Sequence, residues 1–335
     1  MRGVEIRTVG DGEEDLRLDR WFRLHFPELT HGRLQRLLRT GQVRVDGKRV
    51  KANLRLKSGQ AVRVPPLSDQ PAASAKPTRA PAAAAGDEEF VRSLVLHSDG
   101  EVIALNKPPG LAVQGGTGTH RHLDGMLDAL RFDMAERPRL VHRLDKDTSG
   151  ALLLGRTRQA TAALAKSFKS RTAKKIYWAI TVGVPDLRAG RIDLPIAKLP
   201  GKGGERMVAD PKNGQSATTR YLVIETVGRR LAWVALVPAT GRTHQLRVHC
   251  ASIGCPILGD GKYGGAEAFV SGYPVSRKLH LHAREITLPH PSGKGDWSVR
   301  APLPYHMQET WSLFGFDTAA GDALLDDETS EYSIL

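Results

Sequence analysis

The chain has 335 residues, of which 40% are hydrophobic and 25% charged, a composition typical of globular proteins that leaves room for two domains. Its 49 Lys and Arg against 36 Asp and Glu give a net charge of +13, so we expect a polyanionic partner, nucleic acid before an anionic membrane. The lack of an apolar run of about 18 residues excludes a membrane span, and the acidic residues between Glu5 and Asp15 exclude an ordinary signal peptide.

Most of the excess charge lies between Arg17 and Arg63, where 13 basic residues accompany 3 acidic ones. Apolar residues at helical spacing predict two short amphipathic helices there, over residues 18–22 and 34–38. The second helix is expected to begin after Thr30, as its N-cap, and to end at Gly41. Strands are expected on either side of the turn Asp46-Gly47 and over residues 61–64.

The exposed face of the second helix carries arginines at three-residue intervals, and further basic residues follow, from Arg49 to Lys57, without acidic partners. Phosphate groups would balance this charge, although an arginine face on a helix can also be merely solvated. We predict RNA contacts for Arg33, Arg36, Arg39, Arg44 and Lys48.

Residues 17–65 resemble the small RNA-binding module first seen in ribosomal protein S-four. The resemblance rests on Leu18-Asp19-Arg20-Trp21, on the arginine-faced helix and on the hairpin Val43-Arg44-Val45-Asp46-Gly47. It implies a small basic α/β domain over residues 1–65. Residues 66–89 are rich in proline and alanine without an apolar pattern, which predicts a flexible linker.

The remaining chain predicts a larger domain over residues 90–312. Short apolar runs predict strands at residues 94–97, 102–105, 140–141, 151–154, 176–182, 221–225 and 231–237. Helices are expected at residues 122–131, 158–168 and 243–252. This mixture indicates the α+β class, with a mixed or antiparallel sheet and peripheral helices. No glycine-rich nucleotide-binding motif is present, and the acidic residues 313–335 are expected to form a loosely ordered tail.

Residues 140–154 place a histidine, an arginine and two aspartates between two apolar runs. The apolar edges predict buried strands, and the polar middle predicts a loop at the end of a sheet. Asp145 and Arg143 would need a partner or a substrate in such a loop. The segment Asp147-Thr148-Ser149-Gly150 could equally be a polar turn that closes a hairpin.

A second polar cluster follows the strand at residues 231–237. Arg242 lies near the start of the predicted helix and could face a neighbouring loop, although Thr243 could simply cap a helix whose polar face is solvated. Tyr177 lies on a predicted strand, where an aromatic residue usually belongs to the core.

The two cysteines, Cys250 and Cys255, cannot form a disulfide framework and favour a reducing cytoplasm. They lie near His244 and His249 but without metal-ligand spacing, so we expect no metal. We expect structural hydrogen bonds from both histidines and from His142.

The larger domain carries a series of short motifs whose order along the chain resembles that of the RluA-type pseudouridine synthases. With the basic module in front of them, the whole chain resembles the ribosomal large-subunit branch of that family. The resemblance covers residues 90–305 and rests on Asn106-Lys107-Pro108-Pro109-Gly110, His142-Arg143-Leu144-Asp145-Lys146-Asp147-Thr148-Ser149-Gly150, Lys175-Ile176-Tyr177, Gly241-Arg242-Thr243-His244-Gln245-Leu246-Arg247-Val248-His249, Gly259-Asp260-Gly261-Lys262-Tyr263-Gly264 and Leu281-His282-Ala283. It implies a cofactor-independent isomerase, acting as a monomer, that converts uridines of large-subunit (23S) ribosomal RNA to pseudouridine. Transfer RNA as substrate, an RNA-binding protein without activity and an N-glycosidase are the alternatives.

The family's residue roles carry over to five positions. The resemblance implies that Asp145 is the catalytic aspartate and that Arg143 takes the space left by the flipped uridine. Tyr177 corresponds to the tyrosine that stacks on the uracil and is implicated in proton removal at carbon 5. Arg242 corresponds to the arginine that pairs with the aspartate, and Leu281 to an apolar residue of the base pocket. A carboxylate can break a glycosidic bond without a metal, which agrees with this assignment.

Overall fold

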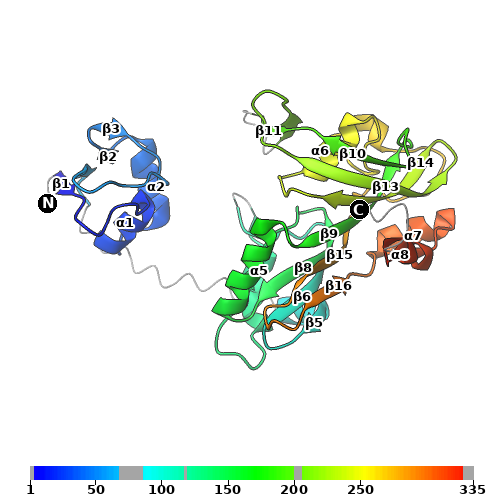
Figure 1. Cartoon of the computed structure of the whole chain (residues 1–335), viewed down its shortest axis with the longest axis horizontal. Helices are drawn as coiled ribbons and strands as arrows, with labels where there is room; N and C mark the ends of the chain where they lie inside the picture. Colours follow the sequence, from blue (N-terminus) through cyan, green and yellow to red (C-terminus); the bar gives the residue numbers. More distant parts are fainter. Residues whose placement is uncertain (1–3, 68–85, 117–118, 200–205, 327–335) are drawn as a thin grey trace. The chain divides into compact units, whose positions relative to one another are not determined.

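A computed structural model of the chain describes residues 4–67, 86–116, 119–199 and 206–326. The chain divides into two compact units, residues 1–79 and 80–335 (Figure 1). Each unit has its own sheet and its own cluster of buried apolar side chains. Each therefore has the sheet and core that a domain needs.

The first unit packs two helices and a four-stranded sheet around one core. The helices are α1, Leu18–His25, and α2, His31–Arg39. The strands pair in the order β1-β4-β2-β3 and are, in that order, Glu5–Thr8, Ala61–Val64, Arg44–Val45 and Lys48–Arg49. The core joins Trp21 and Phe22 of α1 to Leu34 and Leu38 of α2, which confirms the helical spacing read from the sequence.

Local sequence sets both ends of α2 and the turn that follows it. The hydroxyl of Thr30 accepts a hydrogen bond from the backbone N–H of Arg33 at 3.4 Å. Gly41 has a φ of 71°, the left-handed conformation in which glycine commonly ends a helix. Asp46 and Gly47 have φ values of 49° and 74°, as a type I′ turn between β2 and β3 requires.

The expectation that the basic run of this unit lacks acidic partners is wrong at Arg55. Its guanidinium forms an ion pair with Asp15 at 2.6 Å. These residues are 40 positions apart in sequence, and the fold brings them together. Sequence order therefore hides this pair.

The second unit is built on a ten-stranded sheet whose main path has the order β10-β13-β14-β9-β15-β8-β6-β5. In that order the strands are Ala189–Asp193, Thr218–Val227, Leu231–Pro238, Lys174–Val182, Leu281–Pro289, Ser149–Gly155, Val102–Lys107 and Val95–Ser98. Two further strands join it at β15 and β8, namely β16, Asp296–Arg300, and β7, Arg139–Leu140. A separate pair consists of β11, Ile196–Lys198, and β12, Met207–Ala209.

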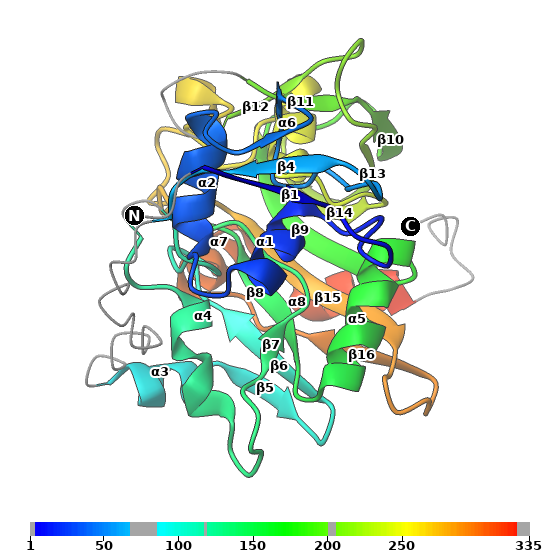
Figure 2. The same ribbon diagram turned by 90° about the vertical axis from the view of Figure 1, so that its left-hand side faces the viewer.

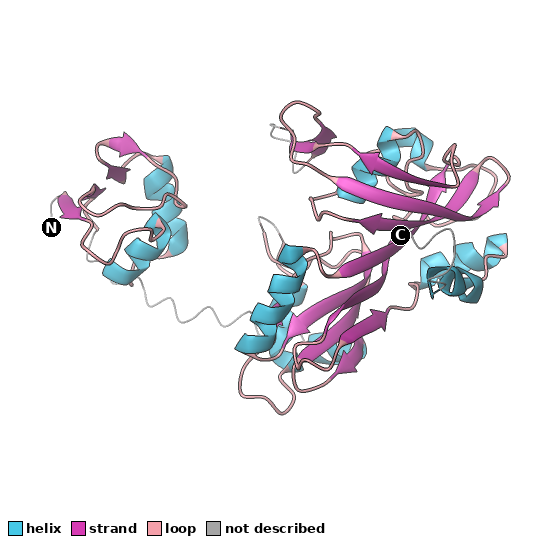
Figure 3. Cartoon of the chain, viewed as in Figure 1, coloured by secondary structure: helices cyan, strands magenta, loops and turns pink. Residues whose placement is uncertain are grey.

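The pairing of β8 with β15 is parallel, whereas the other strand pairs described in this sheet are antiparallel. The sheet is therefore mixed, and the α+β prediction is confirmed. Figure 3 shows the strands at the centre of the unit and the helices around them. The helical segments are α3, Asp87–Ser93, α4, Leu123–Met126, η1, Leu127–Leu130, α5, Arg158–Ser170, α6, Gln245–Ser252, η2, Gly265–Ala268, α7, Tyr305–Phe314, and α8, Thr318–Asp326.

Helices cover both faces of the sheet. On one face of β6 and β8, Ile103 and Leu152 pack with residues of α3, α4 and η1, and on the other face Leu153 packs with Leu164 of α5. Figure 2 shows α3 and α4 to one side of these strands and α5 to the other. The half that contains β9, β13 and β14 is covered in the same way by α6 and α7. Strands buried on both faces read as continuous apolar runs, which explains why β8 and β14 are visible in the sequence.

Two predicted boundaries are wrong. Helix α3 begins at Asp87, inside the predicted linker 66–89, whose residues 68–85 lie outside the described part of the chain. Residues 313–326 of the predicted acidic tail belong to α7, α8 and their connection. They are ordered by tertiary contacts, because Phe316 joins the core and Asp322 pairs with Arg284 at 2.5 Å.

Gly150 allows β8 to approach β15 closely. It has a φ of 111°, and a Cβ atom there would lie 2.2 Å from the carbonyl oxygen of Ala283. Since β8 follows directly after the loop that carries Asp145, this close approach also fixes where that loop leaves the sheet.

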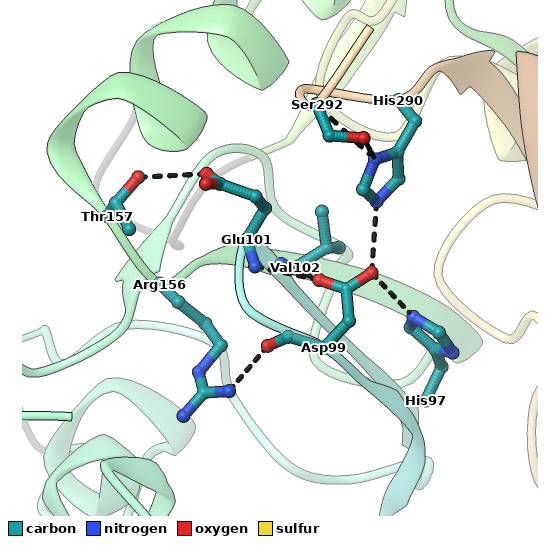
Figure 4. A network of polar contacts seen from close by, with 8 residues as sticks. All are labelled: His97, Asp99, Glu101, Val102, Arg156, Thr157, His290 and Ser292. Atoms are coloured by element: carbon teal, nitrogen blue, oxygen red, sulfur yellow. Dashed lines mark hydrogen bonds and ion pairs between the residues drawn. The ribbon is translucent and has the colours of Figure 1, made fainter. Parts of the chain in front are cut away.

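The turn between β5 and β6 is held by the carboxylate of Asp99 (Figure 4). It accepts hydrogen bonds from the backbone N–H groups of Glu101 and Val102 at 2.7 and 2.8 Å, and from the rings of His97 and His290, both at 3.0 Å. Burial alone would raise the pKa of Asp99, but the hydrogen bonds from His97 and the backbone, with the charge of His290, hold it well below its usual range. This carboxylate joins the β5–β6 turn to the end of β15.

Asp99→Asn is expected to lower the free energy of unfolding near pH 7 by about 1–3 kcal/mol, because the amide loses charge-assisted hydrogen bonds. A depressed folded pKa stabilises the protein above the unfolded pKa of about 4, and this stabilisation is lost as the pH falls through the folded value. Urea unfolding at pH 7 and pH 3 should therefore give a smaller difference between variant and wild type at pH 3. An equal difference at both pH values would mean that the charge of Asp99 does not stabilise the fold.

Candidate active site

The second unit contains a cleft of about 520 Å³ that is lined by all five residues assigned to the active site from the sequence. They come from four separate segments. Asp145 and Arg143 lie in the loop between β7 and β8, Tyr177 lies in β9, Leu281 begins β15, and Arg242 lies between β14 and α6. They meet because β14, β9, β15 and β8 are neighbours in the sheet.

The loop that carries Asp145 is anchored through its backbone. The carbonyl of Asp145 accepts a hydrogen bond from the N–H of Thr148 at 3.2 Å, and that of Lys146 accepts one from the N–H of Gly110 at 2.9 Å. Lys107 is fully buried and donates from Nζ to the carbonyl of Lys146 at 3.0 Å. It also donates to two carbonyls of its own turn, at 2.8 and 2.9 Å. The turn after β6 therefore holds the aspartate loop in place.

Burial lowers the pKa of Lys107 to about 7, although the charges of Asp147 and Asp145 oppose this shift. Its three hydrogen bonds go to backbone carbonyls, which a charged ammonium group binds best. Lys107 therefore acts as a positioning residue, through the backbone of Lys146 beside Asp145.

His244 is the residue that the structure places beside Asp145. Its Nε2 lies 3.9 Å from a carboxylate oxygen of Asp145, within ion-pair range but beyond a hydrogen bond. Its Nδ1 lies 2.6 Å from the hydroxyl oxygen of Tyr263, which accepts a hydrogen bond from the N–H of Met207 at 3.1 Å. In the tautomer in which Tyr263 donates to Nδ1, the Nε2–H group faces Asp145.

The backbone conformation of His244 also indicates that its position beside Asp145 is fixed by surrounding contacts. Its φ is 54°, a left-handed conformation that costs free energy for a residue other than glycine. Such conformations persist where surrounding contacts fix them, and Tyr263 supplies one such contact. The hydrogen bond with Tyr263 confirms the structural hydrogen bond expected of His244, and the structure adds a position beside the carboxylate of Asp145.

Arg242 lines the cleft but does not pair with Asp145, so the predicted ion pair is wrong for this structure. Its Nε donates to the carbonyl of Ser216 at 3.2 Å, and its backbone N–H donates to Oε1 of Gln245 at 3.1 Å. Gln245 Oε1 also accepts from the hydroxyl of Thr240 at 2.7 Å. These bonds hold the loop before α6 and direct the guanidinium of Arg242 to Ser216.

A buried ion pair joins α6, the helix that follows the Arg242 loop, to Asp260. Arg247 donates to both carboxylate oxygens of Asp260, at 2.8 and 2.6 Å, and both side chains are almost fully buried. Burial alone would lower the pKa of Arg247, but the hydrogen bonds and charge of Asp260 outweigh it and raise the pKa. The guanidinium lies 5.0 Å from the ring centre of Tyr263. This pair therefore fixes α6 against the segment that contains Tyr263.

Tyr177 presents a neutral aromatic ring to the cleft. Burial, together with the charge of Asp145, raises the pKa of its hydroxyl above the usual value. The phenol thus keeps its proton near neutral pH, so its ring is suited to stacking and its hydroxyl to hydrogen bonding.

His142 and His249 also make the structural hydrogen bonds expected from the sequence. His142 accepts from the N–H of Leu153 at 2.9 Å and stacks on Phe168 with ring centres 4.2 Å apart. Burial and the charge of Lys175 lower the pKa of His142 to about 3, so the ring is neutral. His249 lies 2.9 Å from the hydroxyl of Thr219. Neither ring adds charge to the cleft at neutral pH.

Sequence reasoning missed Lys107, His244, Arg247, Asp260 and Tyr263 as parts of the site. Each lies in a segment that carried the family resemblance, and this was the available signal. Within the described residues, no group of three or more His, Cys, Asp or Glu side chains could hold a metal ion. None of the helices described is long and apolar enough to cross a membrane.

Comparison with known proteins gives consistent results. Residues 101–252 match the family described as RNA pseudouridylate synthase. The chain is 36% identical to RNA pseudouridine synthase 4, mitochondrial, of Arabidopsis thaliana, across 93% of this chain and 82% of that protein. It is 34% identical to ribosomal large subunit pseudouridine synthase C of Rickettsia conorii, across 87% and 95% respectively.

A solved structure is also similar. Human RNA pseudouridylate synthase domain containing 4 has a TM-score of 0.56 and 30% identity, covering 68% of this chain and 97% of the human one. The fold, the cleft around Asp145 and these relatives agree, and the chain belongs to the RNA pseudouridylate synthase family.

Proposed function

We propose that this RNA pseudouridine synthase isomerises uridines of large-subunit ribosomal RNA, with Asp145 as its catalytic residue. The observation that carries the site assignment is the gathering of Asp145, Arg143, Tyr177, Arg242 and Leu281 in one cleft. The choice of ribosomal RNA is supported by the name of the Rickettsia relative, of which this chain covers 95%. A monomer remains the predicted working unit. The cytoplasm remains the predicted compartment.

The reaction breaks the bond between N1 of uracil and C1′ of ribose, and it forms a new bond between C5 and C1′. The C5 proton leaves and N1 gains a proton, so the product is an isomer and no redox cofactor is required. We assign the carboxylate of Asp145 to the sugar side of this step, as nucleophile or as base. Its side chain is 27% exposed, so substrate can reach it.

The uridine has to leave the RNA stack to reach this carboxylate. We assign the neutral ring of Tyr177 to stacking on the uracil and buried Leu281 to the apolar wall beside it. Arg143 is exposed at the cleft and would take the space that the base vacates. Arg242, directed to Ser216 in this structure, is assigned to substrate binding. The detached uracil has to stay in the cleft until it reattaches, and we assign its retention to Tyr177 and Leu281.

The first unit is proposed to be an RNA-binding domain of the S-four type. Arg36 and Arg39 of α2 and Lys48 of β3 are exposed, and Arg33 is exposed on the same helix. Arg44 is half-buried and donates to the carbonyls of Gly41 and Gly47, both at 3.1 Å, so part of its hydrogen-bonding capacity serves the hairpin. The helix face is therefore the main candidate for phosphate contacts.

Deleting residues 1–65 is expected to weaken RNA binding by roughly tenfold or more and to flatten its dependence on salt, because several phosphate contacts disappear. Filter binding at 50–200 mM salt would measure both effects. Arg36→Gln together with Arg39→Gln should move both quantities in the same direction, whereas Arg229→Gln, in the other unit, is the control. An affinity and a salt slope equal to those of the full chain would refute the role assigned to this unit.

An incubation of the purified protein with unmodified RNA tests the proposed reaction. Pseudouridine in a large-subunit ribosomal RNA transcript is the expected product. Pseudouridine only in a transfer RNA transcript would refute the choice of substrate, free uracil would indicate an N-glycosidase, and binding without change would indicate a non-catalytic RNA-binding protein.

A further inference from the structure

We propose that Lys169, Arg171 and Lys175 form a binding site for a backbone phosphate of the RNA, next to the uridine that enters the cleft. This inference rests on the proposed function, because it assigns part of the substrate to part of the same cleft. The ligand is a phosphodiester, and the three residues lie where α5 ends and β9 begins.

The fold places these cations on one wall of the cleft. Lys169 lies in the last turn of α5, and Arg171 follows it in a left-handed conformation with a φ of 65°. The chain then enters β9, in which Lys175 precedes Tyr177 by two positions. Side chains two apart on a strand point to the same face and lie roughly 7 Å apart along it. Lys175 and Tyr177 are therefore neighbours on the face that lines the cleft.

The charge of the cleft is strongly unbalanced. Asp145 is the one carboxylate among its described lining residues, whereas the basic lining residues are Arg143, Lys169, Arg171, Lys175, Arg242 and Arg247. Of these, Arg247 is neutralised by Asp260. Across the described part of the chain, no carboxylate forms an ion pair with Lys169, Arg171 or Lys175. The wall thus has a positive charge that the protein leaves uncompensated.

The unbalanced charge destabilises the protein most at Lys175. Its side chain is half-buried, and burial, with the nearby charge of Arg171, lowers its pKa. A half-buried ammonium group without a carboxylate partner destabilises the protein unless a bound anion compensates it. The neighbouring ring of His142 is neutral and cannot serve as a counterion. An anion of the substrate is the remaining partner.

A phosphodiester fits this position better than the uracil does. The uracil is uncharged and is assigned to Tyr177 and Leu281, whereas a flanking phosphate lies one sugar away along the chain. Lys175 lies one strand repeat from Tyr177, at the cleft edge formed by the end of α5. Three cations around one phosphate would orient the nucleotide as well as bind it.

Phosphate-ethylation interference tests this site, because it locates the contacted phosphates at every position of the transcript at once. Large-subunit ribosomal RNA transcript with randomly ethylated phosphates is separated into protein-bound and unbound fractions, and the blocked positions are read for each variant. Lys175→Met removes the charge at similar volume, and Lys174→Met, at the exposed position on the opposite face of β9, is the matched control. Arg171→Gln is a second test variant.

Wild type and Lys174→Met are expected to show interference at a phosphate within about two nucleotides of the modified uridine, and Lys175→Met and Arg171→Gln should lose it. Lys175→Met should also bind the transcript about tenfold more weakly, with a salt slope smaller by about 0.7. Its midpoint of thermal unfolding should equal or exceed that of wild type, because a buried charge is removed.

Interference that persists in both test variants, or that Lys174→Met loses equally, would overturn the inference. Failure of the proposed function is a separate result, because wild type would then form no pseudouridine in the same transcript. Interference and salt slope measure binding, so they report on the phosphate site whether or not the chemical step proceeds.

Discussion

Asp145→Asn is expected to reduce pseudouridine formation by at least about 10³-fold while RNA affinity stays within about twofold of wild type. The amide keeps the size and the hydrogen-bonding shape of the carboxylate but loses the nucleophilic and basic oxygen. The backbone bonds that hold the loop, from Thr148, Gly110 and Lys107, do not involve this side chain. Single-turnover assays and filter binding on the same RNA would separate the two effects.

Asp147→Asn is the matched control for this experiment. Asp147 lies two residues away, is exposed, and does not line the cleft that contains Tyr177 and Arg242. The Asp147→Asn variant should therefore retain activity close to that of wild type. An active Asp145→Asn variant, or equal losses in both variants, would exclude Asp145 as the catalytic residue.

Asp260→Asn is expected to lower the free energy of unfolding by about 3–5 kcal/mol, because it leaves the guanidinium of Arg247 buried without a counterion. The effect should exceed that of any single exposed charge in the protein. Urea unfolding measures it directly. Activity should also fall, since Arg247 lines the cleft and α6 would lose its anchor to the segment of Tyr263.

Two controls identify the cause of this destabilisation. Glu267→Gln changes an exposed carboxylate in the neighbouring η2 and should shift stability by less than about 0.5 kcal/mol. Replacing both partners, as Arg247→Met with Asp260→Leu, should recover most of the lost stability because no unpaired charge remains. A double variant as unstable as Asp260→Asn would show that packing, and not the unpaired charge, is responsible.

The sequence predicts best those strands whose side chains are buried on both faces. Strands β8, β9 and β14 appear as apolar runs because helices cover the sheet on each side. Strand β15 was missed because its apolar run is interrupted by His282 and Arg284. His282 is nevertheless fully buried, since Ser149 and the carbonyl of Ala301 hydrogen-bond its two ring nitrogens at 2.9 and 3.0 Å. Polar residues with tertiary partners cannot be told from surface residues by pattern alone.

In the candidate site, too, the sequence predicts what belongs to a local motif and misses what depends on tertiary contacts. Motif order grouped Asp145, Tyr177 and Leu281 because each belongs to a short segment with a recognisable residue pattern, and all three line one cleft. The partner of Asp145 was wrong, because it depends on the left-handed turn at His244 and on the direction of the Arg242 side chain. Neither is set by sequence spacing. The contacts of Tyr263 with His244 and Arg247 likewise exist only after α6 and the following segment pack together.

A map of pseudouridines in the ribosomal RNA of a strain that lacks this protein tests the central claim most directly. At least one uridine of large-subunit RNA should remain unmodified in that strain. Modification should return when the wild-type chain is supplied and should not return with Asp145→Asn. An unchanged large-subunit map, or a change confined to transfer RNA, would contradict the proposed function.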